Sequence, residues 1–295
     1  LGLALQGFRL ASVVTRYGPN EFQAGRGATV KLTIPSALIA RDRGIDDKAT
    51  AIVVDDLKES TYDVNLDVHA YSAVSLSEGD MSLHLEDAAR QVLVPQVDAV
   101  VDYIENALAL ALAGVTADAA ITFDPANPVK VFTAARGALR AKGLDIASAG
   151  TMTAVVGGNV ADALLDSGAL DFQATGTAAA LRDGQLGSIR GFDVMESSRV
   201  GADDLFAFPK SGVSLAARAP EVPMGAAYGA KVNKDSFDLR VLADYDASRT
   251  NDRHIVSTFV GAAIAPAYRV VRDYTAGTAT ALEVACCFIV RVVTA

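Results

Sequence analysis

The sequence predicts a mixed α+β fold, and three patterns support that prediction. Residues 28–34 and 62–76 alternate between apolar and polar side chains, which is the period of half-buried strands. Residues 81–113 repeat apolar side chains at helical spacing. From residue 129 onward, short helical patterns alternate with apolar strand patterns. We therefore expect one long strand pair, one long helix and a second half that mixes both kinds of element.

The two alternating segments predict a long two-stranded ribbon. Residues 62–76, taken as one strand, would span on the order of 50 Å, and an isolated two-stranded ribbon is not stable in water. We therefore expect the ribbon to lie on another surface. The connection between its strands holds charges of both signs around Gly44, which fit either a solvated tip or a contact with a charged partner: Arg41, Asp42, Arg43, Asp46, Asp47 and Lys48.

One face of the second strand carries Asp63, Asp67 and His69, which are residue types that can bind a metal. A solvated polar face explains the same residues. Because the sequence contains no HExxH, no HxH and no cysteine cluster near a histidine, we expect the polar face and no metal.

A long helix is expected over about 81–113. Ser77 or Asp80 can cap its start, and Gly114 is a natural stop. Pro95 lies inside the pattern and is expected to break one backbone hydrogen bond and kink the helix. The charged residues of the pattern are expected to mark its exposed face: Glu86, Arg90, Asp98, Asp102 and Glu105.

After this helix, the pattern predicts a helix over 129–142, a buried strand over 151–156 and a short helix that Asn159 can cap. Further strands are expected near residues 191–197, 205–208, 212–217, 237–245, 255–261, 267–272 and 280–293.

Composition narrows the class of protein. Hydrophobic residues make up 51% of the 295 residues, so disorder is not expected. The net charge of -9 and the lack of a basic run argue against a dedicated nucleic-acid binder, although an acidic wall can still enclose DNA. No stretch reaches the roughly 18 apolar residues of a membrane span, and the start, LGLALQGF, lacks the basic region of a signal peptide. Cys286 and Cys287 are adjacent and would form a strained bridge, so free thiols in a reducing compartment are expected.

The sequence shows no constellation of catalytic residues. The stretch VVGGNVADALL has the strand–glycine–helix shape of an anion-binding turn, but it lacks both GxxxxGK[ST] and GxGxxG, so a plain turn is expected. The carboxylate pairs Asp203–Asp204 and Asp244/Asp246 have no acid–base partner that the sequence identifies. We predict no catalytic residue, no cofactor and no metal, and keep an enzyme with an unrecognised site as an alternative.

Five stretches, taken in order, point to one protein family. They are AGRGATVKLTIP, VNLDVHAYSAVSLSEGD, LVPQVDAVVDYIENALALALAGVT, LGSIRGFDVMESSRV and VPMGAAYGAKVNKDSFDLRVLADYDAS. They resemble the entry strand of an extended loop, its return strand, a spine helix with an internal proline, a recurring Gly-(hydrophobic)-x-Gly-Phe-x-Val-x-x-Ser segment and a late strand that returns from an axial domain. These parts belong to the major capsid protein of tailed bacteriophages, the Hong Kong 97 type fold, and the size is nearest to the podophage coat proteins.

The resemblance implies a division of the chain. It gives an N-terminal arm (1–27), an extended loop (28–76) and a peripheral domain with the spine helix (77–128). A mainly axial domain (129–236) and strands that return to both domains (237–295) complete it. The charged tip residues and the face of Asp63, Asp67 and His69 are then expected to contact adjacent subunits.

The resemblance also implies partners. Hexamers and pentamers of this chain would form an icosahedral head, in the virion, around double-stranded DNA that is enclosed without sequence-specific binding. Assembly would take place in the host bacterial cytoplasm with scaffolding and portal proteins, and decoration proteins are a further expected partner. A lysine–asparagine cross-link is not expected, because no motif supplies an Asn or Glu for Lys48 or Lys58. An encapsulin-type compartment has the same fold and stays open, since LGLALQGFRLA could start a cargo-binding groove.

Overall fold

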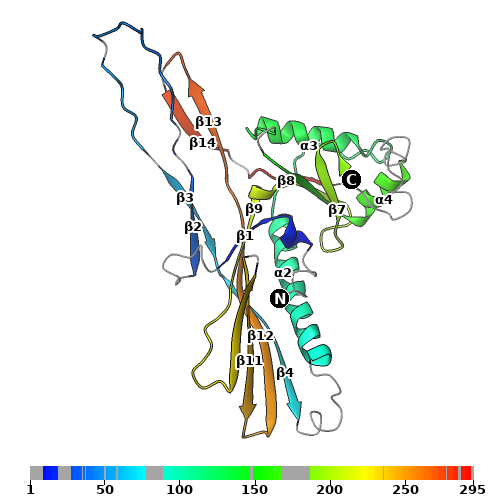
Figure 1. Ribbon diagram of the computed structural model, residues 1–295. Coiled ribbons are helices and arrows are strands. Elements are labelled where there is room, and N and C mark those ends of the chain that lie inside the picture. The colour runs from blue at the N-terminus through cyan, green and yellow to red at the C-terminus, as the bar shows by residue number, and fades with distance from the viewer. Residues whose placement is uncertain are drawn as a thin grey trace.

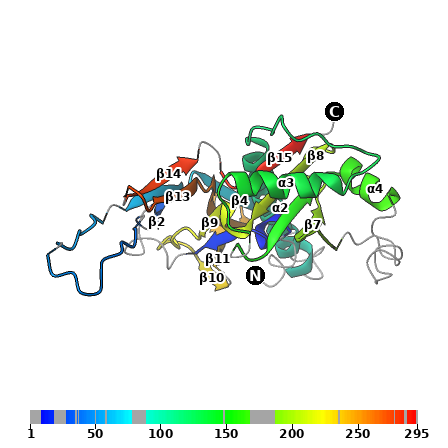
Figure 2. The same ribbon diagram turned by 90° about the horizontal axis from the view of Figure 1, so that it is seen from above.

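A computed structural model of the chain confirms the mixed α+β fold, with two large sheets, a long helix and a hairpin that projects far beyond both sheets (Figure 1). Seen from above, the hairpin extends to one side of the body (Figure 2). The structure describes residues 9–18, 28–34, 36, 38–49, 51–57, 59–77, 89–146, 149–167, 187–234, 236–276, 278–284 and 287–293.

The larger sheet has six strands and carries the long helix on one face. Strands β1 (Thr15–Tyr17), β9 (Val213–Arg218), β12 (Asn251–Ile264), β11 (Phe237–Asp246) and β10 (Tyr228–Lys234) follow in spatial order, and β4 (Val68–Ser77) also pairs with β12. β12 is long enough to pair with β4 through its first part and with β9 through its end. Helix α2 (Val94–Ala113) packs on this sheet.

The contact between α2 and the sheet follows from the two periods in the sequence. Ile104, Leu108 and Leu112 share one face of the helix and are almost fully buried. They form one core with Val256 and Val260, which lie on the same face of β12. Glu105 lies in the same buried row, so its expected place on the exposed face was wrong.

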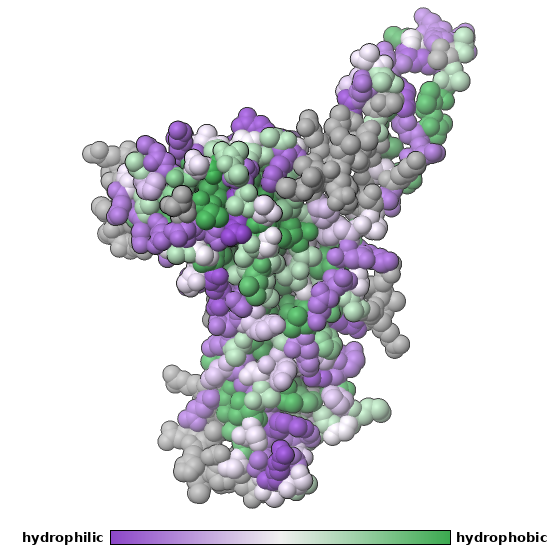
Figure 3. Space-filling view, turned by 180° about the vertical axis from the view of Figure 1, so that it is seen from behind, coloured by the Kyte–Doolittle hydropathy of each residue, from purple (hydrophilic) through white to green (hydrophobic). Residues whose placement is uncertain are grey.

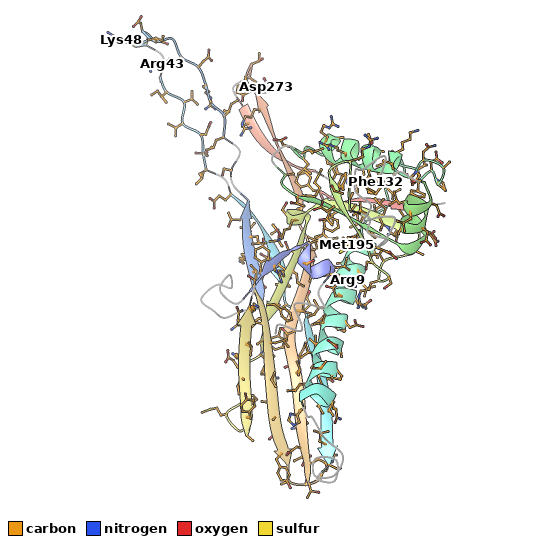
Figure 4. All side chains as sticks on the ribbon, turned by 45° about the vertical axis from the view of Figure 1, so that its right-hand side comes forward. Arg9, Arg43, Lys48, Phe132, Met195 and Asp273 are labelled. Carbon is orange, nitrogen blue, oxygen red and sulfur yellow. The ribbon has the colours of Figure 1, made fainter. Side chains whose placement is uncertain are left out.

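The smaller sheet has five strands and is covered by two helices. Its order is β15 (Val290–Val293), β8 (Asp204–Pro209), β5 (Met152–Val156), β7 (Phe192–Glu196) and β6 (Ser188–Ile189). Helices α3 (Lys130–Ala141) and α4 (Gly158–Asp166) pack against it. Phe132 of α3 lies at the centre of this second core, 6.1 Å from the ring of Phe192 (Figure 4).

Two hairpins complete the fold. The long hairpin, residues 28–65, contains β2 (Thr29–Ile34) and β3 (Ser60–Asn65), which pair antiparallel as expected. The short hairpin, residues 267–284, contains β13 (Ala267–Asp273) and β14 (Thr278–Val284). Both point away from the large sheet in the same direction (Figure 1).

The single strand expected over 62–76 was wrong. It is two strands that change partner at Leu66 and Asp67: β3 pairs with β2, whereas β4 pairs with β12 of the large sheet. Both halves keep the same alternating pattern, so the pattern alone does not reveal where the partner changes. The strand expected over 280–293 is likewise divided, into β14 and β15.

The kink expected at Pro95 stays a prediction. A π-helical turn η5 (Ala89–Leu93) leads directly into α2, and Pro95 stands in the first turn of the α-helical part. The expected start of the helix, over 81–88, lies outside the described residues. Gly157, and not Asn159, is the cap of α4.

Arg291 of β15 joins the two halves of the body. Its guanidinium donates to both carboxylate oxygens of Asp204, at 3.1 and 3.2 Å, and to the carbonyl oxygens of Ala113 and Val115, at 2.6 and 3.1 Å. These carbonyls lie at the end of α2, where the last helical C=O groups lack partners within the helix. One side chain therefore ties the small sheet to the end of the long helix. The division of the chain into the expected domains stays a prediction.

Candidate subunit interface

The root of the long hairpin is seated on the face of the large sheet opposite α2. Val30 and Val64 are buried against Ala216 of β9, whereas the neighbouring Leu215 and Ala217 face the α2 side. β3 crosses β12 at Gly261 so closely that a Cβ there would lie 1.7 Å from the carbonyl oxygen of Asn65. Only a residue without a side chain permits this approach. The sequence thus fixes where the hairpin leaves the body.

Beyond Ile34, the two legs of the long hairpin separate and no longer pair as strands. Residues 38–44 and 51–57 have no assigned strand. Arg41 and Asp55 hold the legs together across this gap by two hydrogen bonds of 3.0 and 2.6 Å. The guanidinium lowers the pKa of the Asp55 carboxyl below its usual range.

Large apolar side chains are exposed along these legs, where a single folded chain would be expected to leave polar ones. Ile45 at the tip and Val54 on the second leg are 102% and 86% exposed, and three more share this state: Ile52, Val53 and Leu57. Figure 3 shows hydrophobic and hydrophilic surface interleaved along the projecting hairpin. Ile52, Val53 and Val54 are consecutive, so both sides of the leg are apolar. Such a surface is typical of an interface.

The charged residues predicted as contacts lie at the same tip. Arg41, Asp42, Arg43, Asp46 and Lys48 are exposed, and Asp47 is half-buried by the turn. Arg43 donates to the backbone carbonyl of Asp47 and lies 3.8 Å from its carboxylate, which closes the tip on itself. Figure 4 places Arg43 and Lys48 at the far end of the hairpin.

The short hairpin braces the long one. Arg272 Nε donates to the carbonyl oxygen of Leu38 at 3.0 Å. An open hollow of about 780 Å³ lies between the legs and the tip of the short hairpin, lined by Ala40, Arg41, Asp42, Val53, Tyr274, Thr275 and Ala276. The two hairpins therefore present one combined surface.

A second exposed surface lies on the large sheet beside the root of the long hairpin. His69 and Tyr71 of β4 and Phe259 of β12 form an aromatic group, with the His69 ring 4.9 Å from Phe259 and 5.5 Å from Tyr71. Tyr71 is 65% exposed. Partial burial lowers the pKa of His69, with a smaller contribution from Arg240. Asp63 and Asp67 are exposed but stand on the hairpin and at the turn between β3 and β4.

A loop closes the other half of this sheet face. Buried Asp238 accepts the backbone N–H of Ala219 at 2.9 Å, and Arg240 donates to the carbonyl oxygen of Glu221 at 2.7 Å. Burial is the main cause that raises the pKa of Asp238. A cavity of about 230 Å³ borders the loop and reaches Phe259 and Leu66. The open part of the face is thus a limited aromatic surface.

The described structure gives other partners to residues that the sequence considered for anion binding or acid–base chemistry. The start of α4 is filled by backbone, because the N–H of Asn159 donates to the carbonyl oxygen of Ala202 at 3.1 Å. Asp204 and Asp244 are engaged by arginines. In the described ranges, no three His, Cys, Asp or Glu side chains gather as a metal site. Nor does any helix in these ranges combine the length and apolarity of a membrane span.

Sequence reasoning found the charged tip but missed the apolar legs. The signal was present in AIVVDDL (51–57), a short run of β-branched residues that belonged to no predicted strand. The aromatic group on the sheet was visible only in part, since His69 was singled out for its polar neighbours and not for Tyr71 and Phe259.

Comparison with known proteins identifies the fold. No protein-family model matches the sequence, and no curated protein matches it. Solved structures do match over nearly the whole chain. One from Mycobacterium phage Che8 covers 96% of this chain and 89% of its own, with a TM-score of 0.59 and 18% identity.

Two capsid structures extend the match. The capsid of cyanophage P-SCSP1u covers 96% of this chain and 86% of its own, with a TM-score of 0.61 and 11% identity. The capsid of a native GTA particle covers 97% and 89%, with a TM-score of 0.59 and 11% identity. The chain therefore has the fold of phage capsid subunits, which confirms the resemblance drawn from the order of its parts.

Proposed function

We propose that this chain is the major capsid protein of a tailed bacteriophage, which assembles with copies of itself into an icosahedral head around double-stranded DNA. One observation supports the proposal most. The far half of the long hairpin exposes five large apolar side chains that no described part of the same chain covers: Ile45, Ile52, Val53, Val54 and Leu57. The fold shared with phage capsids supports the proposal that an adjacent copy of the chain covers this surface.

Burial of these side chains would supply the free energy of association. Fully burying one Val, Leu or Ile stabilises by about 1.5–3 kcal/mol. Ordering the two legs against a neighbour opposes that gain, so each contact would be modest. A closed shell repeats the contact around every symmetry axis, and many modest contacts then hold it together.

The receiving surface would be the aromatic group of an adjacent subunit, His69, Tyr71 and Phe259. This aromatic group is partly exposed and lies beside the root of the long hairpin. It offers apolar area to the apolar legs of a neighbour, whereas the charged tip would stay at the rim of the contact. Asp42, Asp46 and Lys48 form no ion pair within the described chain, so they are available to a neighbour. Charged residues at the rim of an interface determine which partner binds, and in which register, more than they strengthen the binding.

The remaining parts would take the roles that the family gives them. α2 would be the spine of a peripheral domain, and the five-stranded sheet with α3 and α4 the axial domain of hexamers and pentamers. The net charge of -9 would keep DNA off the inner wall. Scaffolding, portal and decoration proteins would be partners, with assembly in the host cytoplasm and the virion as the final location.

The test is assembly of a variant in which Ile52, Val53 and Val54 are all changed to Ser. These side chains touch little of their own chain, so subunit stability should change by no more than about 0.5 kcal/mol each. Ala51→Ser on the same leg is the matched control, because it adds the same hydroxyl without removing a large apolar side chain. In sedimentation, the wild type and the control should form large particles, whereas the triple variant should remain subunits or capsomers.

Assembly of the triple variant at the wild-type concentration would contradict the proposal. Nucleic acid inside native particles would support a phage head, and enclosed enzyme without nucleic acid would support an encapsulin-type compartment instead.

A further inference from the structure

A buried carboxylate in the long helix holds the start of the described chain. Glu105 of α2 is 1% exposed. Its carboxylate accepts three consecutive backbone N–H groups, from Arg9 and Ala11 at 3.1 and 2.9 Å and from Leu10 at 2.8 Å. Figure 4 shows Arg9 beside α2. Residues about ninety-five positions apart are thus joined by a bidentate contact to backbone.

The contact satisfies both partners. Residues Leu10–Ser12 form a short 3-10 turn, whose first N–H groups have no partner within the turn, and Arg9 provides no side-chain cap. Glu105 provides that cap from a distant helix. Within the described residues, Glu105 forms no ion pair with a cationic side chain. Three N–H dipoles are therefore its main compensation for burial, and such bonds to a charged acceptor are strong.

The segment held by Glu105 continues to the root of the long hairpin. Leu10, Ala11 and Val14 are buried in the core between α2 and the large sheet. Next, β1 pairs parallel with β9, with Tyr17 opposite Ala216. Tyr17 also packs on the cluster that seats the hairpin, beside Val30 and Val64. A continuous path of contacts therefore runs from the middle of α2 to the long hairpin.

We propose that Glu105 is a latch that couples the position of α2 to the seating of the long hairpin through residues 9–17. With the latch closed, β1 covers the edge of β9 and Tyr17 supports the hairpin root. With the latch open, the edge of β9 and one side of the root lose their cover together. The latch belongs to the single subunit, so it does not depend on the proposed shell function.

The test is hydrogen exchange of the full chain carrying Glu105→Gln, which keeps the shape but places an N–H₂ group against three N–H donors. Asp98→Asn is the control, because Asp98 is an exposed carboxylate on the same helix. We expect amides of residues 9–17 to exchange at least about tenfold faster. Amides of β2 and β3 should accelerate with them, while the control and the amides of α2 stay at wild-type rates.

Two results would overturn the latch. Unchanged exchange in residues 9–17 would show that Glu105 does not hold the segment, and acceleration confined to 9–17 would show that it does not reach the hairpin. Should Glu105→Gln fail to fold, native-state exchange of the wild type decides. The amides of Leu10 and Ala11 must then open with the same denaturant dependence as those of β2 and β3, and independent opening would refute the coupling.

Discussion

Gly261→Ala should unseat the long hairpin from the body. The added Cβ would lie 1.7 Å from the carbonyl oxygen of Asn65, 2.7 Å from its carbonyl carbon and 3.2 Å from the Cα of Leu66. A normal C···O contact needs about 3.3 Å, so β3 and β12 would have to separate by about 1.5 Å. Every obstructing atom is backbone, so no side chain can rotate away.

The cost follows from what that separation disturbs. Overpacking of this kind costs about 1–3 kcal/mol, and Val30 and Val64, which are almost fully buried at the root, would lose part of their contact with Ala216. We expect about 3 kcal/mol of lost stability, measured as a shift of the urea unfolding midpoint, with fast hydrogen exchange in β2 and β3.

The control is Gly137→Ala in α3. A Cβ there meets nothing within 4 Å, and an alanine in a helix interior is favoured over glycine by about 1 kcal/mol. The same chemical change should therefore stabilise at one position and destabilise at the other. A Gly261→Ala protein as stable as the wild type, with unchanged exchange in β2 and β3, would show that the hairpin is not seated on β12.

Three further changes have defined outcomes. Arg291→Lys should cost about 2 kcal/mol in urea unfolding, because a lysine cannot make the paired contact with a carboxylate and also cap the end of α2; no loss would mean that this junction is unimportant. Burial raises the pKa of Asp238 in the folded protein, so ionisation of this carboxyl costs the wild type stability as the pH rises above about 4. Asp238→Asn cannot ionise and should therefore become progressively more stable relative to the wild type over this range. An equal difference in stability between the two proteins at pH 4 and at pH 7 would contradict this. The contact of Arg41 with Asp55 should be complete above about pH 4 and weaken as the pH falls through the lowered pKa of Asp55, which NMR titration of its carboxyl carbon can follow; a normal pKa there would refute the contact.

The periodicity of the sequence predicted which helices and strands exist more reliably than it predicted what each of them contacts. The alternation continues without a break through Leu66 and Asp67, yet the partners of β3 and β4 divide the segment at these two residues. Strand partners come from residues far away in the chain, so no local pattern contains them. β1, with three residues, is too short for any period to reveal.

The candidate interface was predicted in part for a similar reason. Charges around a glycine turn, such as Arg43 and Lys48, are easily recognised in a sequence as an exposed tip. Apolar residues in a connection are usually taken to be buried, and only the structure shows that no described part of the chain covers them. Glu105 illustrates the opposite case. It stands four residues after Val101 and three before Leu108, on the apolar row of its helix, and that spacing was the available signal that it is buried.

Electron microscopy of the purified full chain tests the central proposal most directly. Assembly through the long hairpin predicts closed particles tens of nanometres across, with the apolar legs of each subunit covered by a neighbour. A protein that remains a monomer or a small oligomer at every concentration, with Ile52, Val53 and Val54 still exposed to solvent, would contradict it.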